Sequence, residues 1–109
     1  MHTEIYEKLK DVARSQRIIY YSDIAPMAGL DMDLPNDRYT IGAILDDINR
    51  YERAQGRPML SAIVVHKDSL KPGQGFSTLA RSLGLLVGKD EDSFYIQELR
   101  KVHDYWASH

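Results

Sequence analysis

The chain has 109 residues, of which 43% are hydrophobic and 28% are charged. These values are typical of one globular domain and exclude both a disordered segment and an enzyme with a separate regulatory domain. Cysteine is absent, which excludes a disulfide scaffold, a zinc ribbon and a thiol nucleophile and suits a reducing compartment. The formal net charge is −2, so the strongly basic balance of many nucleic-acid-binding domains is missing.

The sequence predicts a soluble protein. Residues 1–12 carry charges at every second or third position and no apolar stretch, so a secretory signal is not expected. No apolar run approaches the ~20 residues that a membrane-spanning helix needs. We therefore expect a cytoplasmic protein without membrane contacts.

The first third of the chain predicts two helices joined by an extended segment. Residues 3–16 carry an apolar stripe at helical spacing, and Thr3 is expected to cap this helix. The β-branched and aromatic residues 17–21 (RIIYY) are typical of a short strand. Residues 23–28 predict a brief helix that Gly29 ends, and an acidic loop follows it.

The middle of the chain predicts the longest helix and the best strand. Residues 38–55 repeat their apolar side chains with helical periodicity, and Gly56 is expected to end that helix. Residues 59–66 (MLSAIVVH) are typical of a strand. Their continuous apolar run Ile63–Val65 predicts the buried centre of a small sheet.

The remaining elements are two helices and one short extended segment. Residues 67–75 form a turn-rich loop, and residues 76–83 predict a short helix. Residues 85–87 suit a third strand or an extended link. The last helix is expected to begin at Asp90 or Asp92 and to end near the C-terminus.

This order of elements predicts one mainly helical α+β domain over residues 1–109, with a small sheet. Three helices followed by a strand and a loop are the order of a winged helix. We expect a winged-helix-like core over residues 1–88 and an added C-terminal helix over residues 89–109. A fold of this kind is compatible with many functions.

No intact catalytic or metal-binding motif is present. Ser61 and His66 are five residues apart, and on a strand their side chains point to opposite faces, which argues against a Ser-His-Asp triad. The histidines are not paired at metal-ligand spacing, and Asp31, Asp33 and Asp37 lack the glycine and glutamate of a calcium loop. We expect no catalytic residue, no metal and no cofactor. A hydrolase or nuclease is the least favoured function.

Five basic residues are candidates for contacts with nucleic acid. Arg50, Arg53 and Arg57 follow one another at spacings of three and four, and Lys67 and Lys71 lie beyond the next strand. If the loop that carries the two lysines folds back as a wing, all five cations share a face. The alternative is a solvated helix face on which neighbouring carboxylates pair with the arginines.

A glycine-rich turn precedes the short helix at residues 76–83. The sequence KPGQGF lacks the lysine and hydroxyl residue that complete a Walker loop. Gly73 and Gly75 therefore predict an ordinary turn. Because a helix N-terminus attracts anions, a single phosphate contact beside Lys67 and Lys71 is the alternative.

One pattern extends over residues 5–88. It resembles the DNA-binding domain of the O6-alkylguanine transferases and the alkyltransferase-like proteins. That domain has a tyrosine before an Ile-Ala pair, an arginine before a glycine, an asparagine, a P-C-H-R-V strand and a Gly-Tyr or Gly-Phe wing. The matching positions, in chain order, are Tyr21, Gly42, Asn49, residues 58–65 and Gly75–Phe76.

The resemblance implies a winged-helix fold and a DNA partner, but it does not imply alkyl transfer. Ser61 stands where the family has its reactive cysteine, and Ala62 and Ile63 replace the histidine and arginine that follow it. The family's base-displacing arginine lies three residues before its glycine. In this chain Tyr39 lies three residues before Gly42, and Arg38 precedes Tyr39. The resemblance adds three candidate nucleic-acid-binding residues, which are Tyr21, Arg38 and Tyr39.

The C-terminal helix carries an aromatic stripe that includes Tyr95, Leu99, Tyr105 and Trp106. Such a stripe either closes the core, which we favour, or contacts a protein partner or a second copy of the chain.

The sequence leaves two functions open. The first is a small non-enzymatic module that binds duplex DNA weakly and reads its shape or an altered base. The alternative is a protein-interaction or oligomerisation module that does not contact nucleic acid.

Overall fold

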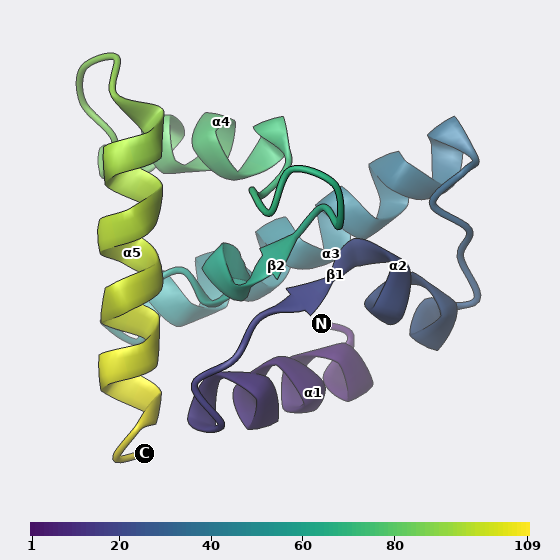
Figure 1. The fold of residues 1–109 in the computed structure, drawn as a ribbon, viewed down its shortest axis with the longest axis horizontal. Helices are drawn as coiled ribbons and strands as arrows, with labels where there is room; N and C mark the ends of the chain where they lie inside the picture. The colour runs from purple at the N-terminus through teal and green to yellow at the C-terminus, as the bar shows by residue number, and fades with distance from the viewer.

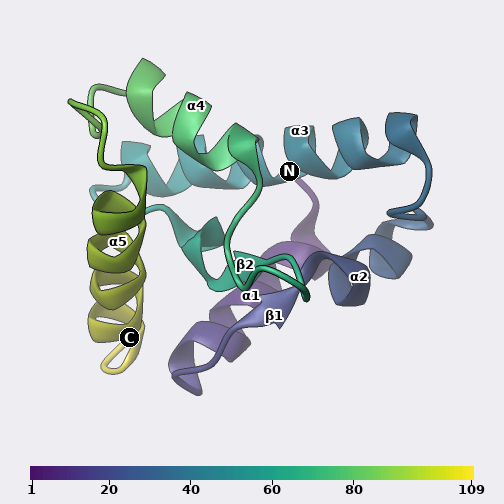
Figure 2. The ribbon, with the colours of Figure 1, turned by 45° about the horizontal axis from the view of Figure 1, so that its top comes forward.

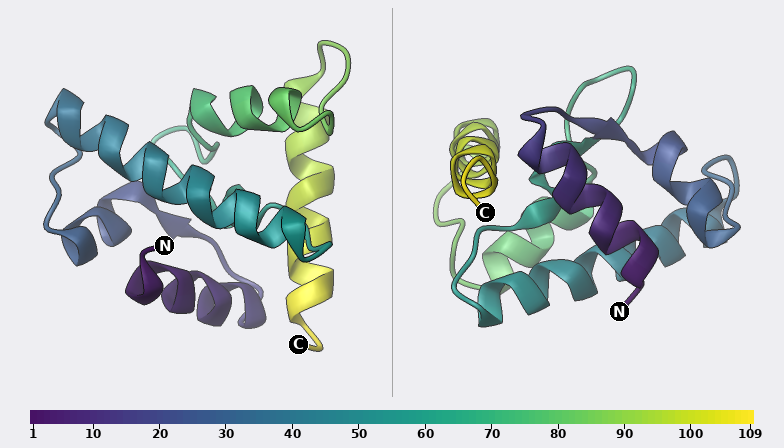
Figure 3. Two further views of the ribbon diagram at one scale, coloured as in Figure 1. Left: turned by 180° about the vertical axis from the view of Figure 1, so that it is seen from behind. Right: turned by 90° about the horizontal axis from the view of Figure 1, so that it is seen from below.

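The longest helix, α3 (Pro35–Ala54), runs across the whole domain in the computed structural model, which describes residues 1–109 (Figure 1). Helix α4 (Gln74–Ser82) lies on one side of α3 and helix α1 (Thr3–Arg14) lies on the other, while α5 (Glu91–Trp106) crosses the C-terminal end of α3 (Figure 3). The short elements are β1 (Ile19–Tyr20), α2 (Tyr21–Ile24), η1 (Ala25–Ala28), η2 (Leu60–Ile63) and β2 (Val64–Val65). This arrangement confirms the predicted mainly helical α+β domain with a small sheet.

The ends of the helices follow the predicted capping chemistry with one exception. His2, and not Thr3, caps α1, because the Ile5 N–H donates to His2 Nδ1 at 3.2 Å. Gly29 ends η1 with a φ of 69°, a left-handed conformation that glycine adopts without strain. At the start of α5, the Asp90 carboxylate accepts the Ser93 N–H at 2.9 Å.

The sheet is a single parallel pair of strands. Ile19 lies opposite Val64, and Tyr20 lies opposite Val65. The prediction of a strand over residues 59–66 is therefore wrong for most of its length, because Leu60–Ile63 form the 3-10 helix η2. A third strand at residues 85–87 is absent.

Two buried polar side chains accept backbone N–H groups at the start of η2. Asn49 Oδ1 accepts the Ser61 N–H at 3.0 Å, and Glu98 accepts the Met59 N–H at 2.9 Å. In a sheet these N–H groups would be paired with a neighbouring strand. A short apolar run alone does not distinguish a buried strand from a buried helical turn.

One cluster of buried apolar side chains receives contributions from all five helices. The 3-10 helix η2 lies at its centre and packs against α1, α3 and α5. Val102 and Trp106 of α5 are buried in this cluster, and Tyr95, Leu99 and Tyr105 pack against it. The aromatic stripe of α5 therefore closes the core of its own chain. Tyr95, Leu99 and Tyr105 remain partly exposed, so contact with a partner through them stays a prediction.

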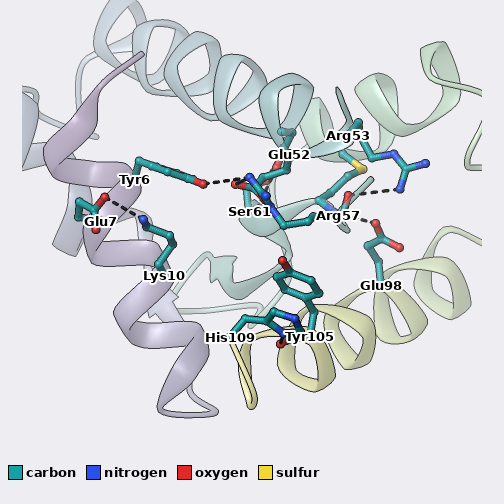
Figure 4. A network of polar contacts seen from close by, with 12 residues as sticks. Tyr6, Glu7, Lys10, Glu52, Arg53, Arg57, Ser61, Glu98, Tyr105 and His109 are labelled. Atoms are coloured by element: carbon teal, nitrogen blue, oxygen red, sulfur yellow. Dashed lines mark hydrogen bonds and ion pairs between the residues drawn. The ribbon is translucent and has the colours of Figure 1, made fainter. Parts of the chain in front are cut away.

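A charged network joins α1 to the end of α3 (Figure 4). Glu52 is fully buried, and its carboxylate accepts hydrogen bonds from the Arg57 guanidinium. Arg57 also donates to the Tyr6 hydroxyl at 3.4 Å. The bond to Glu52 raises the pKa of Arg57, and burial raises the pKa of Tyr6. Arg57 is therefore a structural residue that neutralises a buried carboxylate.

The segment between β2 and α4 rises from the sheet to the start of α4 (Figure 2). Two backbone hydrogen bonds within this segment hold it in a closed turn. The His66 N–H donates to the Lys71 carbonyl at 2.9 Å, and the Leu70 N–H donates to the His66 carbonyl at 2.8 Å. This segment has the place of a wing in the order of elements, but it is a loop and not a β-hairpin. No helix in the chain combines the length and the apolar character that crossing a bilayer requires.

Candidate functional site

A cleft of about 510 Å³ opens between the first half of α3 and the start of α4. Its walls combine the segment before α3, the first half of α3, and the stretch from η2 to the start of α4. The residues that line it include Tyr21, Met32, Arg38, Tyr39, Ile41, Gly42, Leu45, Asp46, Ser61, His66, Gly73, Gln74, Gly75 and Phe76. The cleft is lined by both apolar and polar groups, as in most small-ligand sites.

Aromatic rings form one wall of the cleft. The Tyr21 ring stacks on the His66 ring, with centroids 4.5 Å apart and planes inclined by 29°. Phe76 contacts the ring of Tyr95 edge-on at 6.1 Å, and Phe94 lies at 6.0 Å on another side. These ring contacts and the burial of Tyr21 and Phe76 fix both side chains in the absence of a ligand.

The Tyr21 hydroxyl is held by the backbone at the start of α4. It accepts the Gly73 N–H at 2.8 Å. A Cβ on Gly73 would come within 3.2 Å of this hydroxyl and 3.4 Å of His66 Nε2, so glycine is what allows the close approach. Burial raises the pKa of Tyr21, and the nearby charge of Asp46 raises it further. The hydroxyl therefore keeps its proton, which has no acceptor within the chain.

Asp46 is the only carboxylate that lines the cleft. It is half-buried, and it forms no hydrogen bond or ion pair with any group of the chain. Partial burial raises its pKa, while the charge of Arg50, one helical turn further along α3, lowers it. Asp46 follows Tyr39 by seven residues, which is the spacing that identifies it as a neighbour on the same side of the helix.

The start of α4 presents backbone N–H groups to the cleft. The Gly73 N–H is taken by Tyr21, whereas the N–H groups of Gln74 and Gly75 have no acceptor within the chain. The predicted turn is present, and Gly73 is the residue before the first helical position. Free N–H groups at this end of a helix donate hydrogen bonds to oxygen atoms of a ligand.

Arg38, Tyr39 and Gly42 form the α3 side of the cleft. Tyr39 is 82% exposed, and Arg38 is exposed without an ion-pair partner. A Cβ on Gly42 would meet no atom of the chain within 4 Å. Glycine inside a helix is less stable than alanine by roughly 1 kcal/mol, so its presence here leaves room beside the cleft at some cost in stability.

The five predicted cations do not share one face. Arg57 is bound to Glu52, and Arg53 donates to the Arg57 carbonyl at 3.3 Å and lines a different hollow beside Lys101. Arg50 is exposed on α3 next to Asp46. Arg57 is therefore not available to a shared basic face, because the chain folds back after α3 and turns this side chain toward Glu52. The pairing of an arginine with a neighbouring carboxylate was the alternative that the sequence left open, and contact of the other four cations with nucleic acid stays a prediction.

The two lysines of the loop between β2 and α4 differ in their contacts. The Lys67 ammonium lies 5.8 Å from the centre of the Tyr20 ring. Lys71 forms an exposed ion pair with Asp92 at 3.1 Å. The loop begins at His66 and ends at Gly73, both of which line the cleft, whereas neither lysine is a lining residue. Arg38, Arg50, Arg53 and Lys67 are the candidate cations that are free of ion pairs, and of these Arg53 lines the other hollow.

Ser61 lies at the base of the cleft and is only 3% exposed. Its hydroxyl accepts the Asn49 side-chain N–H at 2.7 Å. The argument that Ser61 and His66 point to opposite faces of a strand was wrong, since Ser61 lies in η2 and both residues line the cleft. No hydrogen bond joins His66 to Ser61, so no base activates the hydroxyl in this geometry.

The acidic loop before α3 uses its carboxylates within the loop. Asp37 accepts the Asp31 N–H at 2.9 Å, and Asp31 accepts the Asp33 N–H at 2.9 Å. No three histidine or acidic side chains gather in a way that would hold a metal ion. Of the histidines, His2 caps α1 and His103 Nε2 lies 2.9 Å from the Arg17 carbonyl.

The positions on which the family resemblance rests surround the cleft. Tyr21, Gly42, Ser61 and the Gly75–Phe76 pair line it, and Asn49 lies directly behind Ser61. No protein-family model matches the sequence, and no curated protein or solved structure matches it significantly.

Proposed function

We propose that the protein is a small non-enzymatic nucleic-acid-binding module and that its cleft receives a nucleobase. The observation that carries this proposal is the exposed pair Arg38 and Tyr39 at the mouth of a cleft walled by Tyr21 and Phe76. A cation for the phosphate and aromatic faces for the base are the two elements of single-base recognition.

The shape and chemistry of the cleft suit a planar ring with polar edges. Aromatic side chains stack on any base, and each such contact contributes ~1–3 kcal/mol. The free N–H groups of Gln74 and Gly75 suit an oxygen of the base or of its phosphate. The space beside Gly42 allows the ligand to approach the backbone of α3 closely.

Only a few cations of the protein are available to attract the phosphate backbone of a nucleic acid. Arg38, Arg50 and Lys67 are free of ion pairs near the cleft. Three neutralised phosphates give a log–log salt slope of about −2.7, from ~0.9 for each phosphate. With so few cations and a net charge of −2, we expect a dissociation constant in the micromolar range or weaker.

The resemblance to the alkyltransferase DNA-binding domain supports the same proposal, since its matching positions border the cleft. It supports recognition and not transfer. Ser61 is a buried hydrogen-bond acceptor without a base beside it, so it has no means of taking up an alkyl group.

The test is to titrate the protein into a labelled duplex, and into its labelled single strand, at two salt concentrations. Fluorescence anisotropy measures the binding. The double variant Arg38→Ala, Lys67→Ala is expected to weaken duplex binding by about tenfold, or ~1.4 kcal/mol. It is also expected to reduce the salt slope by about 1.8. The control is Lys8→Ala, Arg100→Ala, which removes the same two charge types from exposed positions on α1 and α5 outside the cleft. Flat titrations with duplex, single-stranded and alkylated oligonucleotides at low salt would exclude the proposal.

A protein-interaction module is the second candidate. It is favoured by the negative net charge and by two large exposed side chains at the start of α3, Leu34 at 52% and Tyr39 at 82%. Sedimentation velocity of the chain alone over a range of concentrations tests the self-association form of this function. Association together with flat oligonucleotide titrations would favour this candidate.

A further inference from the structure

We infer that Asp46 determines the specificity of the cleft and selects a base that carries an amino group over thymine or uracil. This inference rests on the proposed function and names its ligand class. The observation behind it is a half-buried carboxylate that lines an aromatic cleft without any partner in the chain.

The carboxylate of Asp46 has hydrogen-bonding capacity that the fold does not use. An ionised carboxylate only accepts hydrogen bonds, and burial without donors is costly. Other carboxylates of the chain with a similar or greater degree of burial are occupied, since Glu52 binds Arg57 and Glu98 accepts the Met59 N–H. Asp46 is the exception, and it is the one that lines the cleft.

No neighbouring group of the chain donates a hydrogen bond to the Asp46 carboxylate. Arg50 lies one turn away and lowers the pKa of Asp46, but it does not form an ion pair with it. Arg38 lines the cleft and is likewise unpaired. The Tyr21 hydroxyl accepts the Gly73 N–H and keeps its own proton, but no hydrogen bond joins it to Asp46.

The edge chemistry of the bases then decides which ring fits. Guanine presents adjacent ring N–H and amino groups, which match the two oxygens of a carboxylate. Adenine and cytosine each present an amino group. Thymine and uracil present one N–H between two carbonyl oxygens, and these oxygens face a carboxylate unfavourably. On the opposite side of the cleft, the N–H groups of Gln74 and Gly75 accommodate a base oxygen.

The test uses short duplexes with one unpaired central nucleotide, either dG or dT, and the fully paired duplex. Wild-type protein is expected to bind the dG bulge at least about fivefold more tightly than the dT bulge, a difference of ~1 kcal/mol. Asp46→Asn is expected to reduce this ratio to within twofold, because an amide both donates and accepts hydrogen bonds. The control is Asp47→Asn, which removes the same charge from the exposed neighbouring position and is expected to keep the ratio.

The ratio of the two affinities separates specificity from general electrostatics. Removal of either aspartate charge strengthens attraction to all three duplexes alike, so only a change in the ratio supports the inference. An equal affinity for dG and dT in the wild type, or an unchanged ratio in Asp46→Asn, would overturn the inference and leave the proposed function in place. Failure of every duplex to bind would overturn both.

Discussion

The side-chain amide of Asn49 makes both of its hydrogen bonds to Ser61. Asn49 Oδ1 accepts the Ser61 N–H at 3.0 Å, and Asn49 Nδ2 donates to Ser61 Oγ at 2.7 Å. Both residues are buried, with exposed fractions of 1% and 3%. This pair joins the middle of α3 to η2, and it holds the base of the cleft at a fixed distance from the helix that forms its side.

Replacement of Asn49 by alanine is expected to destabilise the domain by about 2–4 kcal/mol. The change leaves the buried Ser61 N–H without an acceptor, and an unsatisfied buried group costs ~1–3 kcal/mol beyond the lost bonds. Urea unfolding at constant pH measures the effect. Asn36→Ala, at an exposed position in the first turn of the same helix, is the control and should change stability by less than ~0.5 kcal/mol.

Ser61→Ala is expected to leave ligand binding within about threefold of wild type, which is under ~1 kcal/mol. The hydroxyl faces Asn49 and has no base beside it, so its loss removes no chemistry. It leaves the buried Asn49 N–H without an acceptor, which costs ~1–3 kcal/mol of stability. Anisotropy titration and urea unfolding measure the two effects. A loss of binding or of any activity by a hundredfold in a folded variant would show that Ser61 acts on a ligand.

Val64→Asp is expected to unfold the domain. Val64 is fully buried between β1 and the helices around η2, and an unpaired charge there costs several kcal/mol against a total stability of ~5–15 kcal/mol. Circular dichroism during heating detects the loss of the cooperative transition. Val87→Asp is the matched control, because Val87 is 86% exposed and should tolerate the same exchange. Normal melting of Val64→Asp would contradict the assigned core.

Removal of residues 93–109 is expected to give a molten or insoluble chain. The truncation uncovers the part of the core that Val102 and Trp106 close, and it removes the carboxylate of Glu98 from the Met59 N–H. Collapsed chains of this kind bind hydrophobic dyes and lose dispersion in amide NMR spectra. A truncated chain that stays folded and changes only from dimer to monomer would instead assign α5 to a subunit interface.

Asp46→Asn is expected to stabilise the protein at pH 7 and to lose this advantage at low pH. Because burial raises the pKa of Asp46 in the folded state above its unfolded value of ~3.9, ionisation favours the unfolded chain as the pH rises. Below the unfolded pKa both states hold the proton, so the difference disappears. The gain at pH 7 should stay below about 1 kcal/mol, since water screens a half-exposed group.

Thermal unfolding of wild type and Asp46→Asn at pH 7 and near pH 3 measures this linkage. Asp47→Asn, run in parallel, accounts for the loss of one negative charge from the same helix. Equal stabilities of wild type and Asp46→Asn at both pH values would contradict a raised pKa for Asp46. If Asp46→Asn stabilises the protein and also reduces its selectivity between dG and dT, then Asp46 serves ligand binding at a cost in stability.

The helices were predictable because their signals are local. The apolar stripe of residues 3–16, the periodicity of residues 38–55 and the stops at Gly29 and Gly56 all depend on neighbours within a few residues. The last helix was also expected near its observed position, and of its two expected starts, Asp90 and Asp92, Asp90 is the cap. By itself the sequence therefore determined the mainly helical domain and the face that each long helix buries.

Only the tertiary structure decided the form of residues 59–66 and the membership of the site. Asn49 and Glu98 reach across the core to bind backbone N–H groups at Ser61 and Met59, and no local pattern announces such partners. Arg57 turns back onto Glu52 after the helix ends, which removes it from the surface. Asp46 comes to line the cleft because the start of α4 lies beside α3. These outcomes depend on contacts between residues distant in the chain, and periodicity carries no information about them.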